Sequence, residues 1–464
     1  MPQNKKNIII QKFGGSILAN IDKIKELPKY IEAELALGNF PIVVVSALFG
    51  ATNNLLLTCN QFKEELYKSN SNSFISNNLI SSNTIDYNNN LINSDTIQFD
   101  NNLINLNTID SDNNLINLDS ASSYLLNNKS ILINLEIDVA LSTLETFASS
   151  ILAMCLLQKG IKAKSIQGWQ LPILTDSNYN NAHILSLKKT LLNNLLSNNI
   201  VPIISGFQGI DLNNNITTLG RGGSDITALA IAKIMKAKRV DIYKDVVGIM
   251  SADPKIVKNT RLIQNIDYEI MYYMSFFGVK ALNARSCEIA MRYKIPIKIL
   301  SNYVNLNQEE KNNKLNKSTL IMNKKNNHIE RTTILNITQN SNITGIKIQN
   351  NIEYNSLLKE LIDHECNMLK ITDNYIIISN LDISLINKLK LNTINDLIYI
   401  TIIGFGLTNN LVIKEIFNIA KDYNIAILDI NITGINIIIL VQGKNIEYFI
   451  QKAHENFIEK KFLE

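Results

Sequence analysis

The sequence contains few residues of the types that stabilise small secreted domains or bind metal ions. Only four of its 464 residues are cysteines (Cys59, Cys155, Cys287 and Cys366), and none forms a CxxC pair with another. Widely separated cysteines argue against both a disulfide framework and a zinc site. We therefore expect free thiols and no metal ion held by protein side chains.

Histidine is equally scarce, with His183, His328, His364 and His454 dispersed along the chain. None has a serine or carboxylate partner at a spacing typical of catalysis, so surface or packing roles are expected. The net charge of +4 is small and scattered, which argues against nucleic-acid binding. No signal-peptide pattern is present, and no uninterrupted apolar run approaches the roughly 20 residues of a membrane span. We expect a cytoplasmic protein with no membrane partner.

What the sequence does contain is a regular alternation of strand-like and helix-like segments. Hydrophobic residues make up 46 % of the chain, enough for a large core. Strand-like runs at residues 8–11, 41–45, 200–204 and 239–243 are separated by helix-like stretches such as residues 141–159. This order predicts an α/β fold with a mostly parallel sheet covered by helices. A polar boundary near residues 324–330 precedes shorter α and β units.

A low-complexity insert interrupts this alternation at residues 69–130. The sequence NNLI recurs there at Asn77, Asn89, Asn101 and Asn113, a period of about twelve residues. A short solenoid would need a dry stack of Leu and Ile, whereas the high Asn and Ser content favours an expanded, disordered loop. A functional binding repeat has no supporting chemistry. We favour the loop.

A glycine-rich turn follows the first strand and contains Lys12, Gly14, Gly15 and Ser16. Two glycines allow a sharp turn and a close approach to a ligand. A helix that begins at the turn would attract phosphate with its free N–H groups, and Lys12 would add a mobile positive charge. Taken by itself, however, a lysine next to two glycines is more often a plain structural turn.

A second, more specific motif lies at residues 217–225 and includes Arg221, Gly222, Gly223, Ser224 and Asp225. The planar guanidinium of arginine suits a carboxylate, and a glycine backbone can surround phosphate oxygens. Asp225 precedes a helix-like stretch, where it could also serve only as a helix cap.

Two further motifs complete the series. Lys244, Asp245, Met250 and Lys255 follow a predicted strand, where ligands bind in open α/β sheets. The segment 277–282 places Lys280 and Ala281 among small and apolar residues.

In this order the motifs resemble the signature set of the aspartate kinases, which belong to the amino-acid kinase family. The matching segments are KFGGS at 12–16, VSA and GATN within 45–53, LGRGGSD at 219–225 and DVVGIMSADPK at 245–255. Residues 274–297 most resemble the kinase half of bifunctional aspartokinase–homoserine dehydrogenases. The resemblance implies a three-layer αβα amino-acid-kinase sandwich over residues 1–325. It also implies transfer of the ATP γ-phosphoryl to the β-carboxylate of L-aspartate, the first step of lysine, threonine and methionine biosynthesis.

The resemblance also implies a role for individual residues. Lys12 and Lys280 would supply positive charge on two sides of the transferred group, and Asp225 would hold the lysines. The substrate contacts would be Thr52, Glu145, Arg221, Gly222, Gly223 and Ser224. The nucleotide contacts would be Lys12, Gly14, Gly15, Ser16, Lys244, Asp245, Met250, Lys255, Lys280 and Ala281, with Mg²⁺ carried by the ATP.

Several positions depart from the family pattern. Lys244 stands where threonine is usual, Leu144 where glycine is usual, Met250 where an aromatic residue is usual and Lys255 where arginine is usual. The usual HPR triplet is replaced by NAR at residues 283–285. Each change is tolerable on charge grounds, but together they predict a relaxed or weakened enzyme.

The C-terminal segments resemble ACT modules, a degenerate one at residues 331–395 and a second at residues 396–464. The first lacks the glycine-rich turn that helps the family hold an allosteric amino acid. We therefore expect the modules to form a homodimer interface and do not expect feedback inhibition by lysine or threonine.

Two alternatives remain. Another amino-acid kinase would use glutamate, acetylglutamate or a nucleotide as its acceptor. A decayed chain would act only as an amino-acid-binding or scaffold subunit, although the retained Lys12, Arg221, Asp225 and Lys280 argue against decay.

Overall fold

The computed structural model describes residues 7–63, 118–301, 318–323, 332–348, 351–363, 366–372, 374–379, 385–386, 389–443 and 446–460. Most of the repeat insert at 69–130 lies outside the described residues. Its last part does not: residues 118–130, which we expected to belong to the loop, form the beginning of the long helix α4 (Leu118–Gln158).

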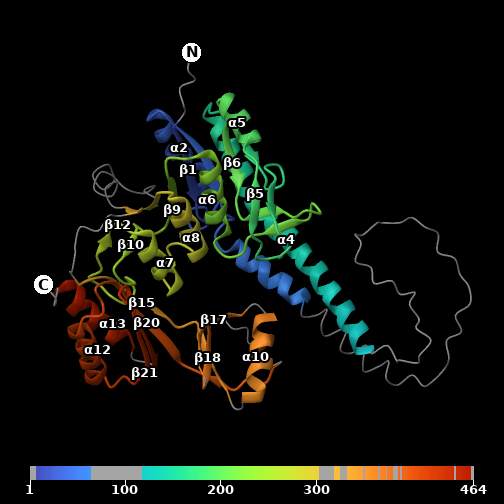
Figure 1. Ribbon diagram of the computed structural model, residues 1–464. Helices are drawn as coiled ribbons and strands as arrows, with labels where there is room; N and C mark the ends of the chain where they lie inside the picture. Colours follow the sequence, from blue (N-terminus) through green and yellow to red (C-terminus); the bar gives the residue numbers. More distant parts are fainter. Residues whose placement is uncertain are drawn as a thin grey trace, which may run out of the picture.

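One large sheet organises the N-terminal two thirds of the chain (Figure 1). Its strand order is β12-β14-β13-β9-β1-β2-β6-β3, and among its neighbouring pairs only β13 and β14 are antiparallel. The sheet is therefore open and mostly parallel, as the sequence predicted. Its strands are β1 (Asn7–Phe13), β2 (Asn39–Val45), β3 (Ala163–Ile166), β6 (Val201–Ser205), β9 (Val240–Lys244), β12 (Asn265–Ile266), β13 (Ile297–Ser301) and β14 (Thr319–Ile321).

Helices cover this sheet and give the expected αβα arrangement. Helix α4 packs on β3, β6 and β2. It also contacts α1 (Ile21–Lys25) and α2 (Pro28–Ala36), and α2 packs on β2. Helix α6 (Gly223–Met235) packs on β1, β2 and β9 and contacts α8 (Ala284–Tyr293), which in turn packs on α7 (Tyr268–Phe276). Helix α5 (Thr190–Ser197) lies against β6.

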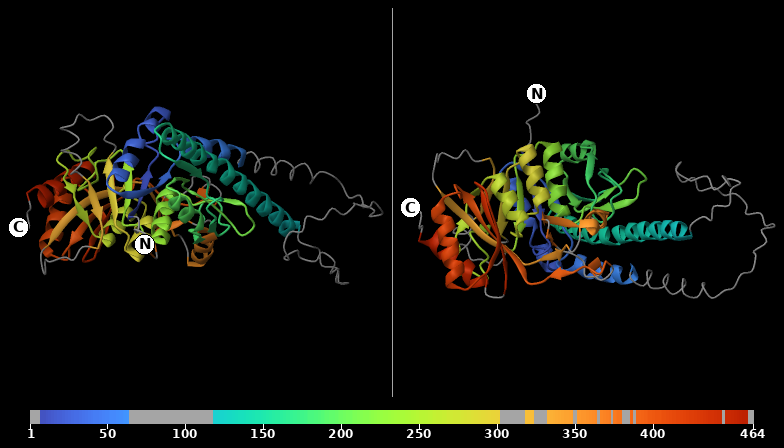
Figure 2. Two further views of the ribbon diagram at one scale, coloured as in Figure 1. Left: turned by 90° about the horizontal axis from the view of Figure 1, so that it is seen from above. Right: turned by 60° about the horizontal axis from the view of Figure 1, so that its bottom comes forward.

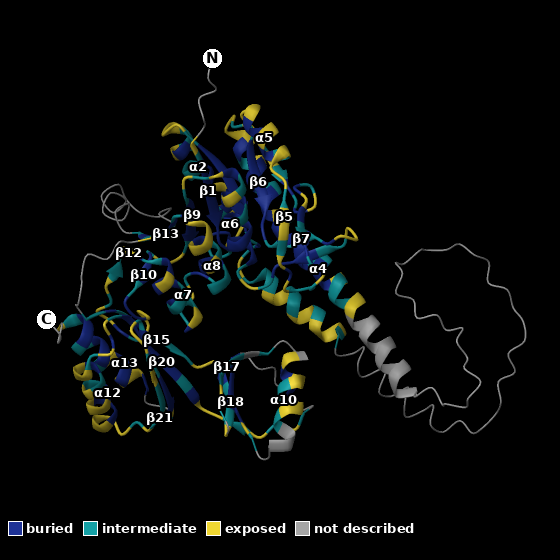
Figure 3. Cartoon of the chain, viewed as in Figure 1, coloured by how far each residue is buried: buried dark blue, intermediate teal, exposed yellow. Residues whose placement is uncertain are grey.

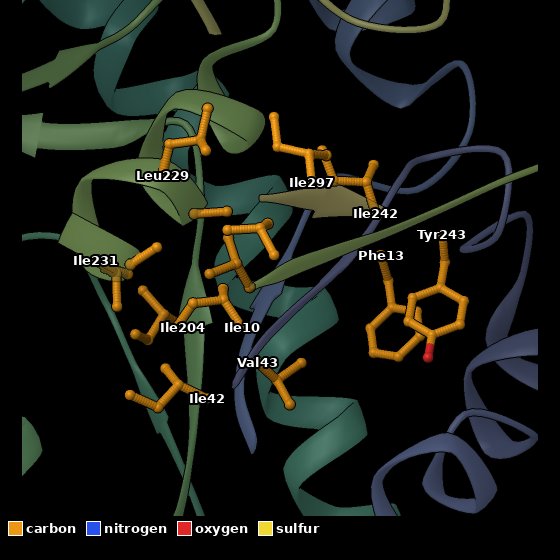
Figure 4. Packing of buried hydrophobic residues seen from close by; sticks show 14 of the residues in the cluster. Ile10, Phe13, Ile42, Val43, Ile204, Leu229, Ile231, Ile242, Tyr243 and Ile297 are labelled. Carbon is orange, nitrogen blue, oxygen red and sulfur yellow. The ribbon is translucent and has the colours of Figure 1, made fainter. Parts of the chain in front are cut away.

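The core between these layers is aliphatic. Figure 4 shows Ile10, Ile42 and Ile204 of the central strands on the side of the sheet that faces Leu229 and Ile231 of α6, whereas Val43 points to the other side. Each fully buried side chain of this size contributes about 1.5–3 kcal/mol through removal from water. The strands are accordingly the most buried part of the molecule (Figure 3).

Residues Ile131–Gln158 of helix α4 are long and apolar enough to cross a membrane by length and composition alone. Half of the most apolar stretch is buried inside the protein, and the helix contacts β3, β6 and β8 (Ile216–Thr218). That packing is typical of a core helix. Figure 2 shows α4 extending beside the helix at residues 51–63, and Lys63 Nζ of that helix donates a 3.0 Å hydrogen bond to Asn134 Oδ1 of α4.

Two smaller sheets flank the large one. The first has the order β5-β4-β7-β8 and consists of β4 (Ile173–Thr175), β5 (Ile184–Leu187), β7 (Gln208–Ile210) and β8. The second is a hairpin of β10 (Ile249–Met250) with β11 (Leu262–Ile263).

The C-terminal third contains two four-stranded sheets with helices, consistent with ACT-like modules (Figure 1). One sheet has the order β17-β18-β16-β19, and its elements are β16 (Ile343–Lys347), α10 (Asn351–Asp363), β17 (Asn367–Ile371), β18 (Tyr375–Ser379) and β19 (Thr393–Ile394). The other has the order β15-β20-β22-β21, and its elements are β15 (Thr333–Asn340), β20 (Leu397–Phe405), α12 (Asn410–Asp422), β21 (Ile427–Ile432), β22 (Asn436–Gln442), α13 (Ile446–His454) and η1 (Glu455–Glu459).

Strand β15 belongs to the sheet of the second module, because it pairs antiparallel with β20 from Thr333 to Asn340. The first module, residues 343–394, is therefore inserted between two parts of the second. We propose domain boundaries on this basis: residues 1–325 for the catalytic domain, 343–394 for the first module, and 332–340 with 397–460 for the second.

Candidate active site

The glycine-rich turns meet at one edge of the large sheet. Strands β1 and β9 are parallel neighbours, so that Lys12 and Lys244 both lie near their carboxyl ends. Helix α6 packs on both strands and places Asp225 in its first turn. The Lys12 ammonium lies 2.6 Å from Asp225 Oδ1, and the Lys244 ammonium lies 3.5 Å from Oδ2 of the same carboxylate. One carboxylate thus holds two lysines.

Burial and charge work against each other in this cluster. The side chains of Lys12 and Asp225 are 6 % and 4 % exposed, which disfavours their charged forms. For Asp225 the attraction of Lys12 and then of Lys244 outweighs burial, and the pKa of the carboxyl is held below its usual value. For Lys12 burial is the larger effect, reinforced by Lys244 and opposed by Asp225, and the pKa of its ammonium is lowered.

Glu145 extends the cluster from helix α4. Its Oε1 accepts a 3.1 Å hydrogen bond from the backbone N–H of Ala47, which follows β2. Burial raises the pKa of Glu145 to about 8, and the Ala47 N–H and the charge of Lys12 offset only part of that effect. Its second oxygen, Oε2, is buried and has no hydrogen-bond partner among the described residues. A ligand group or an ordered water can supply the missing partner.

The glycines are required by the close approach of these segments. Gly222 has φ +79° and caps α6, and a Cβ there would lie 2.6 Å from Cβ of Asn283. Gly220 has φ +71° and would meet a backbone oxygen of Asn180 at 2.9 Å. Residues with a side chain fit neither position. In the first turn, the N–H of Gly14 donates to the Tyr243 carbonyl at 3.1 Å and fixes the turn against β9.

Arg285 and Asp138 contact the segment that leads into the glycine motif, and the sequence analysis assigned a role to neither. Arg285 donates through Nη1 to the Leu219 carbonyl at 2.9 Å and through Nη2 to the Ala182 carbonyl at 3.0 Å. Asp138 accepts from the N–H and the hydroxyl of Thr218 at 2.8 and 2.6 Å. Together they fix Thr218 and Leu219, which lead into the second glycine motif. The retained arginine of the 283–285 triplet was the only signal available.

The predicted site residues separate into three groups by exposure. Lys12, Gly14, Glu145, Gly223, Ser224 and Asp225 are buried; Gly15, Ser16, Thr52, Gly222, Lys244, Met250 and Ala281 are half-buried; Arg221, Asp245, Lys255 and Lys280 are exposed. Lys244 also donates to the Ala281 carbonyl. In the part of the chain that the structure describes, Asp225 is therefore paired with Lys12 and Lys244, whereas Lys280 forms no ion pair with an acid.

This arrangement suits a reaction between two anions. Two lysines converge on the start of a helix, beside backbone turns that admit phosphate oxygens. The buried carboxylate of Asp225 orients the lysines. Glu145, on the other side of Lys12, provides an acidic group for a cationic part of a ligand.

Comparison with known proteins agrees with the geometry. The model of the amino acid kinase family matches residues 7–301. The chain is 41 % identical over 296 residues to an aspartokinase of Rickettsia felis and 39 % identical over 296 residues to an aspartokinase of Rickettsia bellii. Each alignment covers 64 % of this chain, which spans only 58 % and 57 % of the length of these relatives.

Among solved structures, E. coli aspartokinase III in complex with aspartate and ADP has a similar fold. The TM-score is 0.66 at 22 % sequence identity, with 97 % of this chain and 99 % of the other covered. The structural likeness thus extends through the C-terminal modules as well as the sheet. On the match over residues 7–301, this chain belongs to the amino acid kinase family.

Proposed function

We propose that the chain is an aspartate kinase, which transfers the γ-phosphoryl of ATP to the β-carboxylate of L-aspartate to give 4-phospho-L-aspartate and ADP. The observation that carries the proposal is the buried Lys12–Asp225 pair at the joined glycine turns. The named aspartokinase relatives support aspartate as the acceptor. E. coli aspartokinase III, of similar fold, has been solved with aspartate and ADP.

The chemistry explains the choice of residues. The attacking carboxylate is ionised at neutral pH and needs no general base. The barrier comes from repulsion between that carboxylate and the phosphoryl oxygens, so positive charge and alignment provide the catalysis. Lys12 lies at the end of β1 with its ammonium oriented by Asp225. We propose that it contacts the transferred phosphoryl group.

We propose that Lys244 supplies the second positive charge of the site. Its ammonium shares Asp225 with Lys12, and the first glycine turn lies beside both lysines, since a Cβ on Gly14 would be 3.7 Å from Lys12 Nζ and 3.9 Å from Lys244 Cγ. Lys280 is exposed. It would act on the outer, nucleotide side of the site together with Met250 and Ala281, rather than on the transferred group as the sequence alone suggested.

Magnesium would enter with the nucleotide. Among the described residues no group of three His, Cys, Asp or Glu side chains could hold a metal ion. Mg²⁺ commonly keeps several waters and binds substrate phosphates. The proposed site therefore offers lysines and backbone N–H groups to the phosphates, and the ion would neutralise phosphate charge from within the ATP complex.

We propose that Glu145 binds the substrate ammonium and that Arg221 binds a substrate carboxylate, with Thr52 and Ser224 completing the pocket. The orphaned Oε2 of Glu145 supports the first assignment, because a bound ammonium would satisfy it. Arg221 is exposed, and its backbone carbonyl accepts a 3.1 Å hydrogen bond from Asn283 Nδ2, which holds the loop and leaves the guanidinium available to a ligand.

A coupled assay of ADP release tests the function and separates it from the alternatives. Wild-type protein with MgATP is assayed with aspartate, with glutamate and without acceptor. Aspartate-dependent release alone is expected. Release with glutamate only would indicate another amino-acid kinase, and no release with any acceptor would favour the scaffold alternative.

We also propose that the protein is a cytoplasmic homodimer that associates through the ACT-like modules. Light scattering of the full chain should give about twice the monomer mass, and substitutions on the exposed face of the modules should reduce it. We do not expect millimolar lysine or threonine to inhibit, and inhibition by either would contradict the assignment of the modules mainly to assembly.

A further inference from the structure

The loop between β10 and β11 belongs structurally to two domains. It connects strands of the catalytic domain, yet Ala252 and Val257 are 4 % and 3 % exposed and lie in the hydrophobic core of the second ACT-like module. Asp253, Pro254 and Lys255, between them, are exposed. The loop is thus anchored in the C-terminal module on one side and presents polar residues on the other.

A buried chain of hydrogen bonds makes the same connection. The Arg261 N–H donates to Ser251 Oγ at 2.8 Å, Ser251 Oγ lies 2.8 Å from His454 Nε2, and His454 Nδ1 lies 3.0 Å from Glu459 Oε1. His454 is wholly buried and Ser251 is 2 % exposed. With the Ser251 hydroxyl donating to Nε2 and Nδ1–H donating to Glu459, every member has a partner.

Further contacts tie the same two segments together. Asn259 Nδ2 donates to Glu459 Oε2 at 3.1 Å, and Gln451 Nε2 donates to the Ile256 carbonyl at 2.8 Å. On the neighbouring strand β15, Asn336 Nδ2 donates to the Met250 carbonyl at 3.0 Å. The π-helical turn η1 follows His454 directly and brings Glu459 back to its ring.

The order serine, histidine, glutamate is also that of a hydrolytic triad, but the geometry does not suit one. Ser251 Oγ already accepts a backbone N–H and is shielded from solvent, so no acyl substrate reaches it. The chain of hydrogen bonds from His454 instead fixes the position of Ser251, and with it the conformation of the β10–β11 hairpin. Met250 directly precedes Ser251, and Lys255 lies four residues after Ser251 in the same loop.

We propose that His454 is a positioning residue for nucleotide binding, which acts through Ser251 on the β10–β11 hairpin from the C-terminal module. The inference rests on the proposed function, which places Met250 on the nucleotide side of the site, and on the nucleotide role that the family resemblance implies for Lys255. It gives the C-terminal module a direct part in forming the nucleotide site, in addition to any part in assembly.

Calorimetric titration of the full chain with MgADP tests this without requiring turnover. His454→Leu keeps a buried side chain of similar size but removes both hydrogen bonds of the ring and leaves Ser251 unsatisfied. We expect roughly tenfold weaker ADP binding, with less than about a twofold change in kcat at saturating ATP. Glu459→Gln retains an acceptor for Nδ1–H, although it loses the oxygen that accepts from the exposed Asn259 Nδ2, and should bind ADP like the wild type.

Asn456→Ala is the matched control, because Asn456 lies on the same π-helical turn and donates to Glu415 within the C-terminal module at 2.6 Å. It should lower thermal stability and leave ADP affinity unchanged. If His454→Leu does not fold, Ser251→Ala removes the hydroxyl alone and carries the same test.

Unchanged ADP affinity in a folded His454→Leu or Ser251→Ala protein would overturn the inference and leave the proposed function intact. Loss of affinity equal to that in Asn456→Ala would also overturn it, because the effect would then be one of general stability. Wild-type protein that does not bind ADP would instead overturn the proposed function, and the inference with it.

Discussion

The affinity for aspartate should depend on pH because Glu145 is buried. The pKa of its carboxyl is raised to about 8 in the free protein, mainly by burial. A substrate ammonium binds to the ionised form, so below this pH the carboxyl must release a proton as the ligand binds. Aspartate should therefore bind more weakly as the pH falls, by about tenfold per pH unit well below the pKa.

The Glu145 pKa of about 8 sets the size of the change in aspartate affinity. Between pH 8.5 and pH 6.5 the ionised fraction of Glu145 falls by about 25-fold, and the apparent Kd for aspartate should rise by the same factor. At pH 7 the binding of one aspartate should release about 0.9 proton. Calorimetry in two buffers of different ionisation enthalpy, with MgADP present, measures both quantities.

Glu145→Gln is the control, since it keeps the side-chain oxygen that accepts from Ala47 but cannot titrate. Its aspartate affinity should be weak and nearly independent of pH, and it should release no proton. A wild-type affinity that changes by less than about twofold over this range, or the same slope in Glu145→Gln, would refute the assignment of Glu145 to the ammonium.

The raised pKa of Glu145 also makes the protein less stable as the pH rises. A carboxyl whose pKa is higher in the folded than in the unfolded chain binds more protons when folded. Its contribution is therefore fully present below the ordinary glutamate pKa of 4.5 and is lost as the pH rises through about 8. Urea unfolding should show Glu145→Gln gaining stability relative to the wild type as the pH increases from 5 to 8.

Three other predictions follow from the geometry. Lys244→Met should lower kcat by about 10²-fold or more, whereas Lys280→Met should mainly raise the KM for ATP. Steady-state kinetics at saturating aspartate separates the two effects. Equal losses of kcat in both variants would contradict the assignment of Lys244 as the second positive charge of the site. Gly222→Ala should destabilise the protein by about 2 kcal/mol in urea unfolding, because φ is +79° and the new Cβ would strike Asn283; wild-type stability would show that the turn relaxes freely. Arg239→Met should cost about 3–5 kcal/mol, because it leaves the 1 % exposed side chain of Asp241 without its 2.8 Å partner; a loss below about 1 kcal/mol would mean that the pair behaves as a surface ion pair.

The sequence predicted the parts of the fold that depend on local pattern. The strand-helix alternation, the mostly parallel sheet and the glycine turns were expected from periodicity and composition, and the joining of Lys12 to Asp225 was expected from the family resemblance. The shorter α and β units expected after residues 324–330 are also present.

What the sequence could not give depends on long-range placement. That β9 lies beside β1, and so brings Lys244 to Asp225, is a matter of strand order, which local pattern does not encode. The pairing of β15 with β20 spans about sixty residues and a whole inserted module. Likewise Ser251 and His454 are 203 residues apart, and the π-helical turn that brings Glu459 to the ring has no sequence signature.

Comparing Lys12→Met with the wild type in the ADP-release assay tests the central claim most directly. Methionine fills similar space but carries no charge, and circular dichroism would verify that the variant is folded. The wild type should release ADP in proportion to added aspartate, and Lys12→Met should lose at least about 10³-fold of that activity while retaining ADP binding. Aspartate-dependent turnover in a folded Lys12→Met protein at the wild-type rate would contradict the mechanism.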